Sequence, residues 1–332
     1  MKTDYDALLV VSFGGPEGMD DVFPFLENVL RGRNVSRERM VEVAHHYELF
    51  GGVSPLNQRN RDLIASLGEE LKRNGPTLPI YWGNRNWHPM LADTVKQMAA
   101  DGIQHALAFV TSAYSSYSSC RQYLENIAGA QAQAGRGAPC IEKLRAFYNH
   151  PLFIEANVDH IRDALSGLDD PTSAHLVFTA HSIPETMAAN CDYAVQLAET
   201  GRLIAEQLNI GNWQVVYQSR SGSPTQPWLG PDVSDHLRAL RLAGVRNVVV
   251  APIGFVSDHM EVVYDLDVEA SKVAAEIGIN MVRARTAGTH PAFVKMIREL
   301  MLERIDNEPP RFVGSRGPGH NVCAPDCCLL GV

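Results

Sequence analysis

Short apolar runs alternate along this chain with longer stretches that carry apolar residues at helical spacing. The runs have the length of strands, and the clearest are continuous rather than alternating, so both faces are expected to be buried. They cover residues 7–13, 79–82, 106–111, 176–180, 214–217, 247–253 and 281–285. The helical patterns cover residues 61–73, 90–100, 121–134, 153–165, 193–208, 233–243 and 260–277. This largely β-α-β-α order predicts an α/β protein with doubly wound parallel sheets.

Two segments interrupt the alternation and suggest domain limits. Residues 134–139 are rich in Gly and Ala near mid-chain, and the segment from Glu308 is rich in Pro and Gly. We therefore expect one domain over residues 1–138, a second over 139–307, and an irregular cysteine-bearing tail over 308–332. Because doubly wound sheets place ligands at the carboxyl ends of their strands, the functional residues are expected there.

Composition narrows the class of protein. The chain has 332 residues, of which 45% are hydrophobic and 20% charged, which is typical of a globular protein large enough for two modest domains. Its net charge of −9 argues against a nucleic-acid partner. The apolar runs are much shorter than the roughly 20 residues that span a bilayer, and the N-terminus lacks the basic start of a secretory signal. We expect a cytoplasmic protein without a transmembrane segment.

A histidine ends one of the expected strands. Residues 175–185, HLVFTAHSIPE, form an apolar run that ends in His181 and continues into a Ser-Ile-Pro turn. A His at the end of a strand faces the site side of such a sheet, where it can act as a base or a metal ligand. For an isolated His, a core residue bonded to the backbone is the commoner explanation.

Three carboxylates follow another expected strand. Residues 251–270, APIGFVSDHMEVVYDLDVEA, run from a strand through a loop into an acidic helix. Glu261, Asp265 and Glu269 are spaced i, i+4, i+8, which stacks them on one face of an α-helix. Like charges at this spacing repel each other, so the pattern suits a divalent cation or a proton relay. A solvated acidic face is the open alternative.

Loops after other strands offer small polar, aromatic and cationic groups. Residues 110–122, VTSAYSSYSSCRQ, include Tyr117 and either line a flat apolar ligand or only lead into a helix N-cap. The loop SFGGPEG fails the GxGxxG spacing, which argues against a nicotinamide or flavin site. Arg31, Arg33 and the turn at residues 51–55 either meet anionic groups on a ligand or are ordinary surface features.

Taken together, these segments resemble the ferrochelatases over most of the chain. The motifs are, in order, SFGGPEG from Ser12, RGR from Arg31, GGVSPLN from Gly51, YSSYS from Tyr114, TAHSIPE from Thr179, QSRSGSPTQPWLGPD from Gln218 and PIGFVSDHMEVVYDLD from Pro252. Several are long, and an unrelated α/β protein has little chance of carrying all of them in this order. The resemblance implies a lyase that inserts Fe²⁺ into a porphyrin in haem biosynthesis.

The resemblance also implies a fold and a set of site residues. It implies two similar flavodoxin-like domains with the tetrapyrrole in the cleft between them. His181 and Glu261 are expected on opposite walls of the metal site. The remaining implied roles are porphyrin contacts from Ser54 and Tyr117, propionate contacts from Arg31 and Arg33, and a polar line that extends from Glu261 through Asp265 and Glu269.

One position departs from part of the family. Some bacterial ferrochelatases carry a Tyr just before the first glycine after the first strand, whereas this chain has Phe13. Phe13 is expected at the porphyrin, but an axial Tyr–iron contact from this position is excluded. Insertion must remove two pyrrole N–H protons and strip water from Fe²⁺. With an unperturbed His pKa of about 6.5, His181 would be largely neutral and could accept a proton or bind iron, with Glu261 in the complementary role.

The tail carries a cysteine group. Cys323, Cys327 and Cys328 lie within six residues of one another, and four thiolates would hold a [2Fe–2S] cluster or a structural zinc ion. Free thiols are the alternative, although exposed adjacent thiols are prone to oxidation. Some ferrochelatases carry a [2Fe–2S] cluster on C-terminal cysteines and one internal cysteine, and this tail resembles that variant. The internal ligand would come from Cys120, Cys140 or Cys191, with Cys140 as the first choice and Cys120 as the second.

Two other functions and two substrates stay open at this point. A non-catalytic haem- or porphyrin-binding protein with a redox-sensing cluster would share the binding residues, and a cobalt chelatase would share the fold. Among ferrochelatases, the absence of an apparent C-terminal membrane-docking extension favours coproporphyrin III over protoporphyrin IX. The expected partners are the porphyrin and ferrous iron, and the protein is expected to be a monomer.

Overall fold

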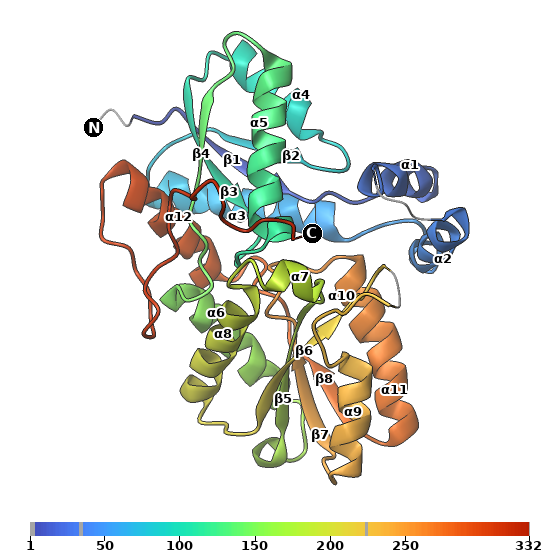
Figure 1. Cartoon of the computed structure of the whole chain (residues 1–332). Helices are drawn as coiled ribbons and strands as arrows, with labels where there is room; N and C mark the ends of the chain where they lie inside the picture. The colour runs from blue at the N-terminus through green and yellow to red at the C-terminus, as the bar shows by residue number, and fades with distance from the viewer. Residues whose placement is uncertain (1–3, 33–35, 223–224, 332) are drawn as a thin grey trace. The chain divides into compact units, whose positions relative to one another are not determined.

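The chain folds into two compact units, each built around one parallel sheet (Figure 1). The structure is a computed structural model that describes residues 4–32, 36–222 and 225–331. The N-terminal unit combines Met1–Thr111, Cys120–Arg145 and Ile297–Pro310, so far as these residues are described. The C-terminal unit likewise combines Ser112–Ser119, Ala146–Met296 and Arg311–Val332. The predicted α/β fold with two parallel sheets is confirmed.

The sheet of the N-terminal unit has the strand order β2-β1-β3-β4, with all neighbours parallel. Its strands are β1 (Ala7–Ser12), β2 (Ile80–Asn84), β3 (His105–Val110) and β4 (Cys140–Lys143). Its helices are α1 (Met19–Val29), α2 (Arg37–Glu48), α3 (Leu56–Asn74), α4 (Leu91–Ala100) and α5 (Gln122–Ala134), and the end of α12 (Pro291–Ile305) joins them. A π-helical turn, η1 (Tyr117–Arg121), leads into α5.

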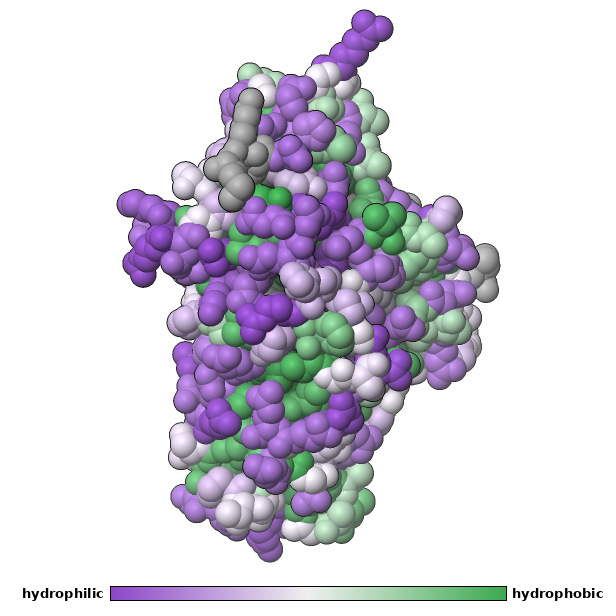
Figure 2. Space-filling model, turned by 90° about the vertical axis from the view of Figure 1, so that its left-hand side faces the viewer, coloured by the Kyte–Doolittle hydropathy of each residue, from purple (hydrophilic) through white to green (hydrophobic). Residues whose placement is uncertain are grey.

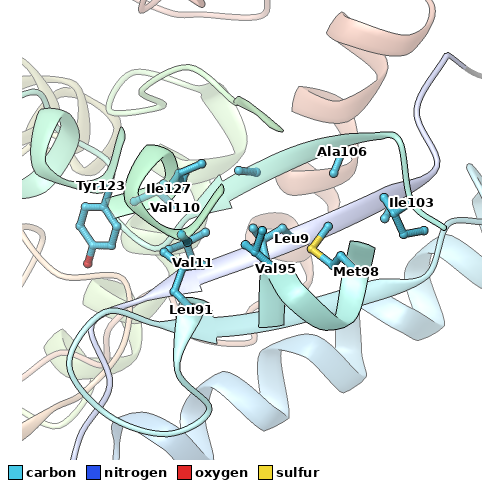
Figure 3. Packing of buried hydrophobic residues seen from close by; sticks show 13 residues of the cluster. Leu9, Val11, Leu91, Val95, Met98, Ile103, Ala106, Val110, Tyr123 and Ile127 are labelled. Carbon is cyan, nitrogen blue, oxygen red and sulfur yellow. The ribbon is translucent and has the colours of Figure 1, made fainter. Parts of the chain in front are cut away.

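Alternate residues of β1 explain the core of this unit. Leu9 and Val11 point from one face of the strand and pack with Val95 and Met98 of α4 and Ile127 of α5 (Figure 3). The residues between them are also fully buried, and α3 supplies buried leucines at four-residue spacing. A strand buried on both faces needs apolar residues at every position, which is why β1 reads as a continuous apolar run.

The sheet of the C-terminal unit has the order β6-β5-β7-β8, again with all neighbours parallel. Counted from the first strand of each sheet, both units have the flavodoxin-like order 2-1-3-4. The strands are β5 (His175–His181), β6 (Trp213–Gln218), β7 (Asn247–Ala251) and β8 (Asn280–Arg283). The helices are α6 (Pro151–Leu165), α7 (Glu185–Ala188), α8 (Tyr193–Leu208), α9 (Val233–Leu242), α10 (Met260–Tyr264) and α11 (Ser271–Ile277), with a 3₁₀ turn η2 (Pro171–Ser173) and a π-helical turn η3 (Asp265–Ala270).

One layer of the C-terminal core joins the sheet to the acidic helical segment. Val177, Val248 and Val250 of the sheet pack with residues of α9 and with Val262 and Leu266. This packing fixes the segment that carries the predicted carboxylates against the sheet. Helices α6 and α8 pack against each other and against β5, β6 and β7.

Some elements differ from those expected. The sequence pattern missed β4, a four-residue strand at the edge of its sheet, because the sequence Cys-Ile-Glu-Lys is too short and polar to stand out. It also missed α1, α2 and α12. The expected helix over residues 260–277 is instead α10, η3 and α11, with a π-helical turn in the middle.

The division between the units also differs from the expected limit after residue 138. Strand β4 pairs with β3, so the N-terminal unit continues to Arg145. The chain later returns to this unit, where Glu303 accepts two hydrogen bonds, at 2.7 and 2.8 Å, from the buried Arg145. The predicted cleft between two domains stays a prediction.

Figure 2 shows hydrophilic residues over much of one face of the molecule, with smaller hydrophobic areas between them. Among the described residues, no helix is both long enough and apolar enough to cross a membrane.

Candidate functional site

His181 and Glu261 meet at the switch point of the C-terminal sheet. His181 is the last residue of β5, and Glu261 lies in the first turn of α10, shortly after β7. Strands β5 and β7 are neighbours, and the chain changes direction across the sheet between them. Doubly wound sheets bind ligands at such points. His181 Nε2 lies 3.6 Å from Glu261 Oε1, so the two expected partners face each other at ion-pair distance.

The backbone selects which ring nitrogen of His181 is available. Nδ1 lies at hydrogen-bonding distance from the carbonyl oxygen of Ser182. Because a carbonyl only accepts, Nδ1 carries the hydrogen, and Nε2 is the nitrogen that can release a proton or bind a cation. A His that donates its second N–H to a carbonyl is the usual arrangement in metal sites. Tyr193 also donates to the carbonyl oxygen of His181, at 3.0 Å.

The pair stabilises its own charges. Burial by itself lowers the pKa of His181, but the Glu261 carboxylate outweighs burial and raises this pKa. Burial by itself raises the pKa of Glu261, but His181 outweighs it and lowers that pKa. The Glu261 carboxylate therefore favours the protonated form of His181, against the expectation of a largely neutral ring. Its imidazole carries protons on both ring nitrogens at neutral pH, because a carboxylate lies beside it.

Asp265 is held by the end of the neighbouring strand. The Ser219 hydroxyl donates to Asp265 Oδ2, and Gln218 Nε2 lies 3.5 Å from the same oxygen. Gln218 also donates to the carbonyl oxygen of Glu261, at 2.6 Å. Burial raises the pKa of Asp265 to about 7, against the opposing effect of the Ser219 hydrogen bond and with help from Glu261 and Glu269. Asp265 therefore exchanges protons near neutral pH.

The three carboxylates differ in exposure. The side chain of Glu261 is 44% exposed, and Glu269 is an exposed residue. They do not share an ideal α-helical face, because Asp265 and Glu269 lie in the π-helical turn η3. Single π turns are frequent at functional sites because they change which side chains align. Asp267, which lies between Asp265 and Glu269 in the sequence, pairs with Arg283 instead.

His259 orients the helix that carries Glu261. Its Nδ1 accepts a hydrogen bond of 3.1 Å from the Glu261 backbone and so caps the N-terminus of α10. Burial lowers the pKa of His259, so its ring stays neutral and can accept this bond. Phe255 packs edge-on against the ring, at 4.8 Å between centroids.

The hydroxyl-rich loop lies partly in the core of the C-terminal unit. Tyr114 is buried and donates to the carbonyl oxygen of Ile253, at 2.9 Å, next to the β7 loop. Ser115 donates its N–H to Gln196 of α8. Tyr117 is partly exposed at the start of η1, so it is the tyrosine of this loop that can reach a ligand.

The other expected porphyrin-binding residues belong to the N-terminal unit. Phe13 follows β1, packs edge-on against Phe25, and has the Arg85 guanidinium 5.7 Å above its ring. Ser54 is 3% exposed and its hydroxyl accepts a hydrogen bond of 3.4 Å from the backbone of Leu56. Arg31 is exposed at the end of α1, and Arg33 lies outside the described residues.

The cysteines fall into separate places. Cys323 and Cys327 lie near each other in the C-terminal arm (311–331), and Cys328 is buried beside Cys327. The two proposed internal ligands belong to the N-terminal unit. Cys140 is the exposed first residue of β4 rather than part of a loop, and Cys120 is buried in η1.

Several residues of this site escaped the sequence interpretation. Gln218, Ser219, Tyr193 and His259 all contact His181, Glu261 or Asp265. The available signals were that Gln218 and Ser219 directly follow an expected strand and open a family motif, and that His259 lies in the motif of Glu261. Nothing in the local pattern indicates that this strand end lies against the acidic segment, because the contact depends on the sheet order.

Two parallel sheets and an imidazole–carboxylate pair at a strand switch point define a chelatase-like α/β protein. Comparison with solved structures supports the fold, since SirB from Bacillus subtilis matches with a TM-score of 0.57 at 14% identity, over 90% of this chain and 97% of that one. The sequence model of the ferrochelatase family matches residues 5–305. The chain belongs to the ferrochelatase family, as the sequence motifs predicted.

Curated relatives cover nearly the whole chain. A ferrochelatase of Rhodopirellula baltica is 56% identical over 98% of this chain and 93% of its own length. Coproporphyrin III ferrochelatases of Nocardia farcinica and Streptomyces griseus are 51% and 49% identical over 97% and 98% of this chain, and over 96% and 93% of their own lengths. The predicted enzyme class, a lyase that inserts ferrous iron into a porphyrin for haem synthesis, is confirmed at the level of the family.

Proposed function

We propose that this protein inserts Fe²⁺ into coproporphyrin III. The observation that carries the proposal is the His181–Glu261 pair, 3.6 Å apart at the switch point of a parallel sheet. The chain is 49% and 51% identical to two coproporphyrin III ferrochelatases, which supports coproporphyrin III rather than protoporphyrin IX as its substrate.

His181 and Glu261 are proposed as the catalytic pair and the iron-binding pair. Insertion exchanges two pyrrole N–H protons for one Fe²⁺ ion and changes no oxidation state. Because Glu261 raises the pKa of His181, Nε2 carries a proton at neutral pH and must lose it before it can accept one from a pyrrole or bind the ion. An arriving cation favours this loss, because its positive charge replaces the proton next to the Glu261 carboxylate.

Asp265 and Glu269 are proposed as a relay between this pair and the solvent. A group with a pKa of about 7 can both take and release a proton near neutral pH, which suits Asp265 for the middle of such a line. Glu269 is exposed and can exchange with water. The same carboxylates would attract Fe²⁺ on its way in.

The porphyrin is proposed to contact Phe13 and Tyr117 through their rings and Arg31 and Arg33 through its propionates. Arginines suit carboxylates because their planar groups donate two parallel hydrogen bonds. Ser54 remains a proposed contact, and its burial favours a contribution through the loop that it supports.

The C-terminal arm is proposed to hold a [2Fe–2S] cluster through Cys323, Cys327 and Cys328. The donor set fits, because thiolates are the usual ligands of such clusters. Cys140, and after it Cys120, is the candidate for a fourth ligand. A bound cluster supplies a one-electron redox centre. Protein purified without oxygen should show iron–sulfur absorption, and a colourless protein that contains zinc would contradict the cluster.

The protein is also proposed to act as a monomer in the cytoplasm. Two compact units with polar exposed residues support this proposal. Size-exclusion chromatography with light scattering and cell fractionation test the two statements separately.

The decisive experiment compares wild type with His181→Ala and Glu261→Gln in two assays. Both variants should lose at least about a hundredfold of Fe²⁺ insertion, the usual scale for loss of a positioned acid or base, while coproporphyrin III binding stays within about twofold. Undiminished insertion in both variants would sink the assignment. Activity with Co²⁺ but not Fe²⁺ would favour a cobalt chelatase, and binding without turnover would favour a porphyrin-binding protein.

A further inference from the structure

The C-terminal arm brings a histidine into its cysteine group. His320 Nε2 lies 3.5 Å from Cys327 Sγ. The nearest donor atoms of His320, Cys323 and Cys327 all lie within 4.8 Å of one another, the single such cluster of metal-ligating side chains among the described residues. Cys328 Sγ lies 3.5 Å from Cys327 Sγ. Three thiols and one imidazole are therefore gathered in nine consecutive residues.

These separations match donors that share a metal centre. With a metal–sulfur bond of about 2.3 Å and a metal–nitrogen bond of about 2.0–2.1 Å, two donors on one tetrahedral ion stand roughly 3.5–3.8 Å apart. The His320–Cys327 and Cys327–Cys328 separations, both 3.5 Å, lie at this value.

The arm is attached to its unit on both sides of the group. Before the group, Val313 donates to the carbonyl oxygen of Asn149 at 2.9 Å, and Asn149 donates to the carbonyl oxygen of Gly317 at 2.7 Å. After it, Gly331 packs so closely on Thr186 of α7 that a side chain there would collide with the backbone. Figure 1 shows the end of the chain beside α7. The arm is thus positioned by its own unit.

We propose that His320 is the fourth ligand of the metal centre in the arm, together with Cys323, Cys327 and Cys328. The inference rests on the proposed metal centre and changes one of its ligands, since it replaces the internal cysteines Cys140 and Cys120. The arm then supplies the whole ligand set by itself.

A further thiol in the same unit is the natural competitor. Cys191 follows α7, and its Sγ donates to the carbonyl oxygen of Met187 at 3.3 Å. Among the described residues, the donor atoms of His320, Cys323 and Cys327 form one group, and Cys191 does not belong to that group. His320 is exposed, and an imidazole ring nitrogen is a common metal ligand.

The test uses the full chain purified without oxygen. Iron, sulfide and zinc per chain are measured, with absorption spectra and reduction potentials, for wild type, His320→Ala and His320→Cys. His320→Ala should lose at least about fivefold of the bound metal. His320→Cys should keep it with a shifted spectrum and a lower potential, because a thiolate adds negative charge where the imidazole has none. His45→Ala, an exposed His of α2, is the matched control and should change nothing.

Cys140→Ser, Cys120→Ser and Cys191→Ser complete the experiment, and each should retain the wild-type metal content. The proposal is overturned if His320→Ala keeps its metal, spectrum and potential, and the cysteine variant that loses metal then identifies the ligand. If wild type holds zinc and no sulfide, the proposed cluster fails, yet the ligand assignment is still decided by whether His320→Ala loses the zinc.

Discussion

At the scale of single residues, the site works through charges that face each other at the ends of strands. The Ser182 carbonyl fixes the tautomer of His181, and Glu261 fixes its charge. Iron insertion exchanges two protons for one Fe²⁺ ion, so the site needs a route by which the displaced protons leave. Asp265, whose pKa is about 7, is the residue best suited to start that route.

Ser219→Ala tests this role. In the wild type, the Ser219 hydroxyl stabilises the Asp265 carboxylate. Its removal should therefore raise the pKa of Asp265 above about 7. The carboxylate then forms only at higher pH, and the rising limb of the insertion rate against pH should move to higher pH by about half a unit or more, the order expected for one charge-assisted hydrogen bond.

The control for this experiment is Ser166→Ala. Its hydroxyl also donates a hydrogen bond, but to the backbone of Asp163 at an exposed helix end. An unmoved pH profile in Ser219→Ala would remove Asp265 from the proton route.

At the scale of elements, the loops after β5 and β7 pack without spare room beside His181. Gly254 follows β7 and donates its N–H to the carbonyl oxygen of Thr179, at 2.9 Å. A side chain at Gly254 would collide with Ala180, the neighbour of His181. Glycine is required here for the close approach of two backbones, and the sequence motif around Gly254 reflects that contact.

Gly254→Ala should therefore lower the free energy of unfolding by about 1–3 kcal/mol, the usual cost of overpacking. It should also reduce insertion activity, because Ala180 and His181 are displaced together. Urea unfolding and the insertion assay measure the two effects. Gly211→Ala has open space around the added atom and is the matched control. Equal stability of both variants would show that the loops rearrange without cost.

At the scale of the whole molecule, the chain leaves the N-terminal unit and returns to it. Arg145 and Glu303, 158 positions apart, are both buried and form a bidentate ion pair within that unit. A buried charge without its partner is strongly unfavourable. The pair therefore ties the end of α12 to the segment after β4.

Glu303→Gln should destabilise the protein by about 3–5 kcal/mol, since it leaves the Arg145 charge buried without its counter-ion. Glu42→Gln breaks the exposed pair with Arg39 and should cost less than about 1 kcal/mol. Chemical denaturation of both variants provides the comparison. A similar small loss in the two variants would mean that water reaches Arg145.

The sequence by itself determined the fold class, most strands and helices, and the family. Fully buried strands such as β1 need apolar residues at every position, and this pattern is visible without any tertiary knowledge. His181 and Glu261 were accessible in the same way, because each follows a recognisable strand and lies in a long motif.

Only the tertiary structure decided which side chains interact with one another. Gln218 and Ser219 meet Asp265 from 46 or 47 positions away because β6 and β7 flank β5, and no local pattern encodes that order. The pKa of His181 likewise depends on a carboxylate 80 positions away, which the sequence places on the same edge of the sheet but not at 3.6 Å. Spacing along the chain predicts elements, whereas charge, protonation and ligand sets depend on distances that arise when those elements pack.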